Sequence, residues 1–102
     1  MTVKLVVLYA HPEDADVFNR HYLDVHVPLV SKIPGLQRFE SGRISAALDG
    51  GEHTYSRVAE LYFADQETLG KGFASAEGKA TAADYQKIAP PGSRMFVEEL
   101  DG

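Results

Sequence analysis

The sequence predicts an α+β domain in which two helical segments cover one face of a four-stranded antiparallel sheet, in the order βαββαβ. Two observations lead to this fold. Strand-like and helix-like hydrophobic periods follow one another along the chain, separated by turns that contain proline or glycine. The 102 residues, 44% hydrophobic and 25% charged, suffice for one compact core but not for two. We therefore expect a single domain over residues 1–102.

The first strand and the first helix occupy the first third of the chain. Residues 3–10, "VKLVVLYA", are apolar on both alternating faces, which is typical of a strand covered on both sides. A helix is expected from about Glu13 to Ser31, because apolar residues recur there at intervals of three and four. Pro28 cannot donate a backbone hydrogen bond, so we expect a kink at this point. Pro34 and Gly35 then turn the chain.

The remaining elements are two strands, a helical region and a last strand. Residues 36–45 and 54–63 are expected to form strands joined by a connection containing Asp49, Gly50 and Gly51. Asp65 resembles the N-cap of a helical region that Gly70, Gly72 and Gly78 are expected to break or kink. Residues 94–100, "RMFVEEL", read as the fourth strand.

Helices on one face leave the other face of this sheet without a cover. Val6 and Leu8 oppose Leu5 and Val7 across the first strand, so apolar side chains lie on both faces. An exposed apolar surface of this kind favours association with another molecule. We expect a homodimer in which two sheets pack face to face, with an apolar cavity between sheet and helices.

Two stretches of the chain resemble the EthD family, which belongs to the dimeric α+β barrel superfamily. They are "LYAHPEDADVFNRHYLDVHVPLVSKIPGLQRFE" and "VAELYFADQETLGKGFASAEG", with Tyr22, His26, Pro28, Leu29 and Pro34-Gly35 in register. The resemblance implies a ferredoxin-like fold and a dimer. It associates the chain with degradation of ethyl tert-butyl ether alongside a cytochrome monooxygenase system. Related fungal domains resemble dehydratases or decarboxylases, and sister families include muconolactone isomerases and cofactor-free monooxygenases.

His26 and Tyr22 are the candidate catalytic residues. On a helical wheel His26 lies at the shoulder of the apolar stripe, one turn after Tyr22, and Pro28 aims it away from the helix axis. An imidazole titrates near neutral pH, so His26 is a candidate general acid or base, with Tyr22 orienting a substrate oxygen. The alternative is a structural histidine that hydrogen-bonds a carbonyl freed by the kink.

Five further residues are candidates for contact with a ligand. Tyr9 and Tyr62, near the ends of their strands, are expected to line one cavity and present hydroxyl groups to it. Glu60 falls on one face of a central strand, where it would pair with Arg43 or Arg57 or have a raised pKa. Leu29 and Phe73 are the apolar candidates from the two helical segments.

Several functional classes receive no support from the sequence. A net charge of −5 argues against nucleic-acid binding, and the chain has no cysteine. His21 and His26 differ by about 140° around an α-helix, so they are not expected to share a metal, and we expect no metal or cofactor. No apolar run reaches the length of a membrane span and the amino terminus does not resemble a signal peptide, so we expect a cytoplasmic protein.

The leading functional hypothesis is a cofactor-free enzyme that performs acid–base chemistry on a hydrophobic oxygenated or aromatic compound. Isomerisation, dehydration, decarboxylation and oxidation are the candidate reactions. The alternative hypothesis is a non-catalytic ligand carrier or an accessory protein of a monooxygenase-type degradation pathway. A third possibility is a purely structural dimer with a filled interior.

Overall fold

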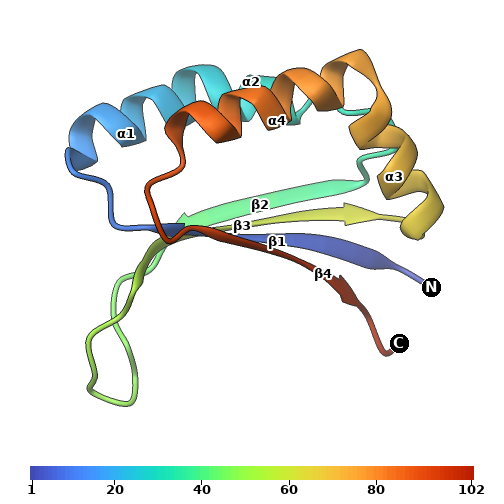
Figure 1. Ribbon diagram of the computed structural model, residues 1–102. Helices are drawn as coiled ribbons and strands as arrows, with labels where there is room; N and C mark the ends of the chain where they lie inside the picture. The colour runs from blue at the N-terminus through green and yellow to red at the C-terminus, as the bar shows by residue number, and fades with distance from the viewer.

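A computed structural model describes all residues, 1–102, and it shows one sheet with one layer of helices. The helices α1, α2 and α4 run along one face of the sheet, and α3 lies at one end of this layer (Figure 1). In chain order the elements are β1 (Val3–Ala10), α1 (Ala15–His21), the π-helical turn η1 (Tyr22–His26), α2 (Val27–Val30), β2 (Arg38–Arg43), β3 (Tyr55–Phe63), α3 (Gln66–Ala74), α4 (Ala76–Ile88) and β4 (Arg94–Glu99).

The sheet has the strand order β2-β3-β1-β4, and every neighbouring pair is antiparallel. This is the split βαβ arrangement of ferredoxin-like folds, so the expected fold class is confirmed. β1 and β3 are the two central strands. Their register places Val7 opposite Ala59 and Leu8 opposite Val58. Because side chains alternate along a strand, Val7 and Ala59 face the helices while Leu8 and Val58 lie on the outer face.

The core lies between the sheet and the helices. It consists of ten buried residues: Val3, Val7, Tyr9, Phe18, Tyr22, Val30, Ile33, Ala59, Leu61 and Phe63. Tyr9, Tyr22 and Phe63 are the largest side chains that are fully enclosed. Removing side chains of this size from water is the largest favourable contribution to folding. The outer face of the sheet has no cover within this chain.

The first helical segment is interrupted by a π-helical turn and not only kinked. Asp14 caps the segment by accepting hydrogen bonds from the N–H groups of Asp16 and Val17, and α1 then begins at Ala15. In η1 the N–H of Val27 donates to the carbonyl of Tyr22, five residues earlier. The wide turn comes directly before Pro28, whose nitrogen has no hydrogen to donate. A π-helical turn contains about one residue more than an α-helical turn. The side chains of α1 are therefore rotated about the helix axis relative to those of α2.

The second helical region breaks at Ser75, and not at a glycine as the sequence predicted. Ser75 ends α3 and its side chain caps α4 by accepting from the N–H of Gly78. Gly72 and Gly78 instead permit close packing. A Cβ on Gly78 would lie 2.1 Å from the carbonyl oxygen of Gly72, and one on Gly72 would lie 2.7 Å from that of Pro34. These glycines bring α4 close to α3 and α3 close to the turn after α2.

Candidate functional site

A small cavity lies between the sheet and the helices at the centre of the molecule. Its volume is about 110 Å³, and 11 of its 14 lining residues are hydrophobic. The sheet contributes Val7, Tyr9, Phe39, Ala59, Leu61 and Met95, and the helical segments contribute Tyr22, His26, Val30, Phe73, Thr81, Ala82, Tyr85 and Gln86. His26 is the one lining residue whose type has an ordinary pKa near neutral pH.

His26 is held by a buried carboxylate on the facing helix. Its Nδ1 lies 2.8 Å from Oδ2 of Asp84, which belongs to α4, and the two side chains are only 5% and 8% exposed. Because an ionised carboxylate only accepts hydrogen bonds, Nδ1 must carry the proton. In the neutral ring Nε2 is then the acceptor, and the hydroxyl of Tyr9 lies 3.4 Å from it. The arrangement orients an unprotonated nitrogen at the cavity wall.

His21 joins the same carboxylate from the solvent side. Its Nε2 lies 2.8 Å from Oδ1 of Asp84, and its side chain is 27% exposed. The expected separation of about 140° between His21 and His26 was wrong, because it assumed an unbroken α-helix. The turn η1 begins directly after His21 and ends at His26, and it contains one additional residue per turn. Residues five apart therefore come to the same side of the helix.

The protein environment keeps His26 neutral. Burial lowers the pKa of His26 below its ordinary 6.5, and the hydrogen bond and charge of Asp84 only partly oppose this shift. Burial alone would raise the pKa of Asp84, but the hydrogen bonds from His21 and His26 outweigh it and lower that pKa. Burial also raises the pKa of Tyr9 far above its ordinary 10.0. At neutral pH the site therefore holds a carboxylate, a neutral imidazole and a neutral phenol.

Tyr22 packs against His26 but does not hydrogen-bond to it. The two rings stack with centroids 5.5 Å apart, and the Tyr22 hydroxyl is buried without a hydrogen-bond partner. Burial raises the pKa of this hydroxyl. The guanidinium of Arg57, a residue of β3, lies 4.3 Å from the centre of the Tyr22 ring. The hydroxyl group that reaches His26 is thus that of Tyr9.

Four of the seven predicted site residues line this cavity, and three do not. His26, Tyr22, Tyr9 and Phe73 lie together around it. The expectation that Tyr62 shares a cavity with Tyr9 was wrong. In the β1–β3 register Tyr62 lies opposite Lys4, five residues from Tyr9, so its side chain lies on the outer face of the sheet. Leu29 lies elsewhere, beside Ala76 and Ala80, at the surface of the helix layer.

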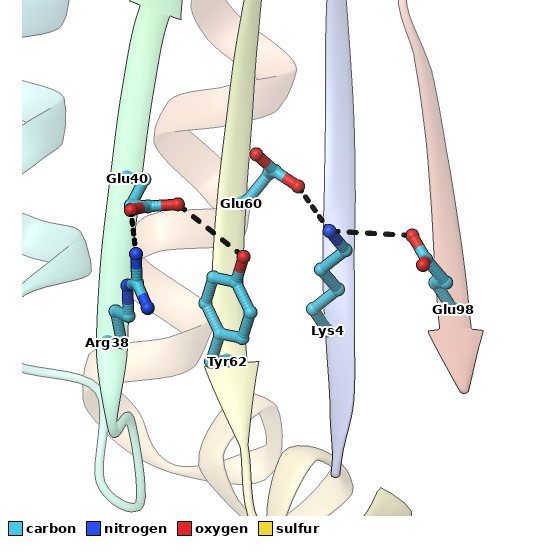
Figure 2. A network of polar contacts seen from close by, with 6 residues as sticks. All are labelled: Lys4, Arg38, Glu40, Glu60, Tyr62 and Glu98. Atoms are coloured by element: carbon cyan, nitrogen blue, oxygen red, sulfur yellow. Dashed lines mark hydrogen bonds and ion pairs between the residues drawn. The ribbon is translucent and has the colours of Figure 1, made fainter. Parts of the chain in front are cut away.

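Glu60 also lies on the outer face, and its predicted partners were wrong. Its carboxylate pairs with Lys4 of the neighbouring strand, and not with Arg43 or Arg57. Figure 2 shows that Lys4 also reaches Glu98 on β4, while Arg38 and Tyr62 both contact Glu40 on β2. Arg57 faces the helices, which puts it on the opposite side of β3 from Glu60. The six residues labelled in Figure 2 form a polar network on the outer face of the sheet, opposite the face that carries the helices and His26.

Asp84 is the functional residue that sequence reasoning missed. It lies 58 positions after His26, on a helix whose other residues are mostly small or charged. The buried residues of α4 are Gly78, Thr81 and Asp84, at intervals of three, whereas Ala76, Ala80 and Ala83 are exposed. None of the buried residues is a large apolar one, so hydrophobic spacing did not mark this face. Without a known crossing of α4 over η1, nothing in that spacing identifies its partner.

No helix of this structure combines the length and the apolar character that crossing a membrane requires.

Comparisons with known proteins agree with the fold. Residues 10–91 match the EthD domain family. An uncharacterised 11.0 kDa protein from the thcB-thcC intergenic region of Rhodococcus erythropolis is 39% identical over 97 residues, covering 94% of this chain and 93% of that protein. The crystal structure of an EthD-family protein from Bacillus halodurans has a TM-score of 0.92 and 37% identity, covering 98% of this chain and 99% of the other.

More distant structures share the fold alone. SnoaB, described as a cofactor-independent oxygenase from Streptomyces nogalater, has a TM-score of 0.71 at 15% identity, covering 99% of this chain and 94% of the other. Several further structures with this fold are described as dimeric ferredoxin-like proteins.

Proposed function

Because the chain belongs to the EthD domain family, and because its cavity contains an oriented neutral imidazole, we propose that it is a small enzyme in which His26 acts as a general base. The observation that carries this proposal is the hydrogen-bond arrangement of one ring. Asp84 occupies Nδ1, which leaves Nε2 facing the cavity beside the Tyr9 hydroxyl. A base aimed into an apolar cavity suits proton abstraction from a bound molecule.

The catalytic step moves one proton from the ligand to Nε2 of His26. The imidazolium that forms is stabilised by the carboxylate of Asp84, which lies 2.8 Å from Nδ1. His21 holds the second oxygen of that carboxylate and so fixes its orientation. The hydroxyl of Tyr9 is placed to donate a hydrogen bond to the oxygen of the ligand once the ligand displaces it from Nε2.

The cavity limits the size of the ligand. An apolar cavity of roughly 150 Å³ accommodates benzene, and the present cavity is about 110 Å³. We therefore propose a hydrophobic oxygenated compound with at most one ring. Isomerisation and dehydration begin with such a proton transfer, and decarboxylation ends with its reverse, in which the imidazolium returns a proton to the carbanion left by loss of CO2. Oxidation in which the deprotonated ligand reacts with molecular oxygen also begins with proton abstraction, and the likeness to a cofactor-independent oxygenase supports that variant.

We also propose that two copies of the chain associate through the outer face of the sheet. Val6, Leu8, Val58 and Phe96 form an apolar strip across β3, β1 and β4 on that face. The charged residues drawn in Figure 2 pair with one another within the chain. Arg94, which lies opposite Leu8 on the same face, has no carboxylate partner and lies over the Phe96 ring. Packing the strip against a second copy therefore buries apolar area while the charges drawn in Figure 2 keep their partners, and Arg94 is the one charge on this face that needs an acceptor from the second copy or from water. The dimeric proteins among the related structures support this arrangement.

Two measurements test the proposed enzyme function: ligand binding first, and then turnover of the ligands that bind. Thermal unfolding is measured with a panel of phenols, quinones, ketones and ethers of one ring or fewer, because a ligand of the folded state raises the melting temperature. Compounds that raise it are incubated with the wild type, His26→Gln and the control His53→Gln, in air and under nitrogen. Products are identified by mass spectrometry.

We expect His26→Gln to bind the ligand and to turn it over about 10²–10⁴-fold more slowly, while His53→Gln is unchanged. His53 lies in the β2–β3 connection and does not line the cavity. Full turnover by His26→Gln would contradict the catalytic proposal. Binding without turnover in the wild type would also contradict it and would support a ligand carrier.

A further inference from the structure

Arg57 is a buried cation without an acidic partner. The residue is only 6% exposed, and no carboxylate lies within ion-pair distance of its guanidinium. Its Nη2 donates to Oδ1 of Asn19 over 3.3 Å, its charge lies over the Tyr22 ring, and its Nε has no hydrogen-bond partner. Buried arginines are normally paired, because taking an isolated charge out of water is costly. This charge therefore lacks a counter-ion.

A second arginine lies directly beside it. Arg43 on β2 is the cross-strand partner of Arg57 on β3, and it also has no carboxylate within ion-pair distance. Like charges directly opposite one another in a ladder destabilise a sheet. In a chain whose net charge is −5, this end of the sheet carries a local excess of positive charge. An anion bound between the strand end and α1 would remove that repulsion.

An open pocket of about 620 Å³ lies at this place. No acidic residue lines it; its walls are His11, Pro12, Ala15, Asn19, Arg43, Ile44, Ser45 and Ser56. Three immediate neighbours of Arg57 are among them: Ser56 before it in sequence, Arg43 across the ladder, and Asn19, its hydrogen-bond acceptor. The pocket is distinct from the cavity of His26, with which it shares no lining residue.

Arg57 orients Asn19 as a hydrogen-bond donor toward this pocket. The side-chain oxygen of Asn19 accepts from Arg57, so the two hydrogens of the amide nitrogen are left for another acceptor. Arg43 is exposed, and its planar guanidinium can donate two parallel hydrogen bonds. An amide and a guanidinium without a competing acid match the two oxygens of a carboxylate.

We propose that the pocket lined by Arg43 and Asn19 binds a small organic carboxylate. Arg43 contacts the carboxylate directly, Asn19 donates to it, and the buried charge of Arg57 stabilises it from behind Asn19. One directly contacting arginine suits a singly charged ligand better than a doubly charged phosphate. The inference does not depend on the chemistry of His26, because the two sites are separate.

Titration calorimetry at low ionic strength tests the proposal with acetate, benzoate and inorganic phosphate as probes. We expect the wild type to bind at least one carboxylate more tightly than phosphate, and Arg43→Gln to weaken that binding about tenfold or more. Arg20→Gln, an exposed arginine on α1 that does not line the pocket, is the matched control and should stay within twofold of the wild type. His26→Gln should bind as the wild type does.

A second variant separates a binding role from a structural one. Asn19→Asp places a carboxylate beside Arg57, so it supplies the missing counter-ion. We expect this variant to melt at a higher temperature than the wild type and to lose carboxylate binding. The proposal is overturned if carboxylates do not bind the wild type, if phosphate binds more tightly than they do, or if Arg43→Gln or Asn19→Asp binds them as tightly as the wild type does.

Discussion

His26 and Asp84 are both buried, and the ionisation of each is therefore linked to folding. The pKa of His26 lies below 6.5 in the folded protein, so the unfolded chain binds a proton more readily. The stability that neutral His26 contributes is fully present above pH 6.5, and it is lost as the pH falls through the lower pKa that His26 has in the folded protein. The pKa of Asp84 is lowered below 3.8, which removes further stability in stronger acid.

Denaturant unfolding from pH 8 to pH 4 measures this loss. We expect the free energy of unfolding to decrease below pH 6.5 by up to about 1.4 kcal/mol per pH unit for each proton taken up. In His26→Gln the decrease just below pH 6.5 should be smaller, because that residue no longer titrates. An equal slope in the wild type and in this variant would show that His26 is not the group responsible.

Asp84 is expected to contribute to stability as well as to the site. Asp84→Ala leaves two histidines without their acceptor, one of them buried, and should lower the free energy of unfolding by about 3 kcal/mol. Glu77→Ala, an exposed acid on the same helix, should change it by less than about 0.5 kcal/mol. Urea unfolding at pH 7 compares the two variants, and a loss for Asp84→Ala no larger than for Glu77→Ala would contradict the described network.

Residue type and spacing along the chain identified four residues of the cavity wall: Tyr9, Tyr22, His26 and Phe73. His26 and Tyr22 were found because a histidine at the edge of an apolar stripe is unusual, and both line the cavity. Asp84 was missed because its role depends on how α4 crosses η1, and that contact joins residues far apart in sequence. Tyr62 and Glu60 were misplaced because an alternating strand pattern does not say which face carries the helices.

Among the elements, the strands were predicted more accurately than the helices. Residues 3–10 form a strand with the expected bounds, since β-branched and aromatic runs rarely fit another structure. The first helix differs from the expectation because it contains a π-helical turn. One such turn is too short to change the 3.6-residue hydrophobic pattern from which the helix was predicted. That turn is also what brings His21 and His26 to one carboxylate.

The close approach of α3 and α4 gives a test at the scale of elements. A Cβ on Gly78 would meet backbone atoms of Gly72 and Phe73 at 2.1 and 2.5 Å, so Gly78→Ala should lower the free energy of unfolding by at least about 2 kcal/mol. Gly70 lies inside α3 with open space around it, so Gly70→Ala should raise that free energy by up to about 1 kcal/mol. Thermal unfolding of both variants and of the wild type measures these changes. A Gly78→Ala variant that is more stable than the wild type would contradict this packing.

At the scale of the whole molecule, the uncovered face of the sheet predicts self-association. Phe96 is 43% exposed within the apolar strip, and Phe96→Glu would place a charge there. We expect the wild type to sediment as a dimer at micromolar concentration and Phe96→Glu as a monomer. Val17→Glu, at a position 61% exposed in the helix layer, should remain dimeric. A monomeric wild type would contradict the proposed association.

The central claim is that Asp84 holds His26 as a neutral base with its free nitrogen toward the cavity. Nitrogen-15 NMR of the His26 ring at pH 7 tests it most directly, because the two ring nitrogens have different shifts when protonated and when free. We expect a proton on Nδ1 and none on Nε2, with the signal of Nε2 changing when a cavity ligand binds. A doubly protonated ring, or a proton on Nε2 alone, would contradict it.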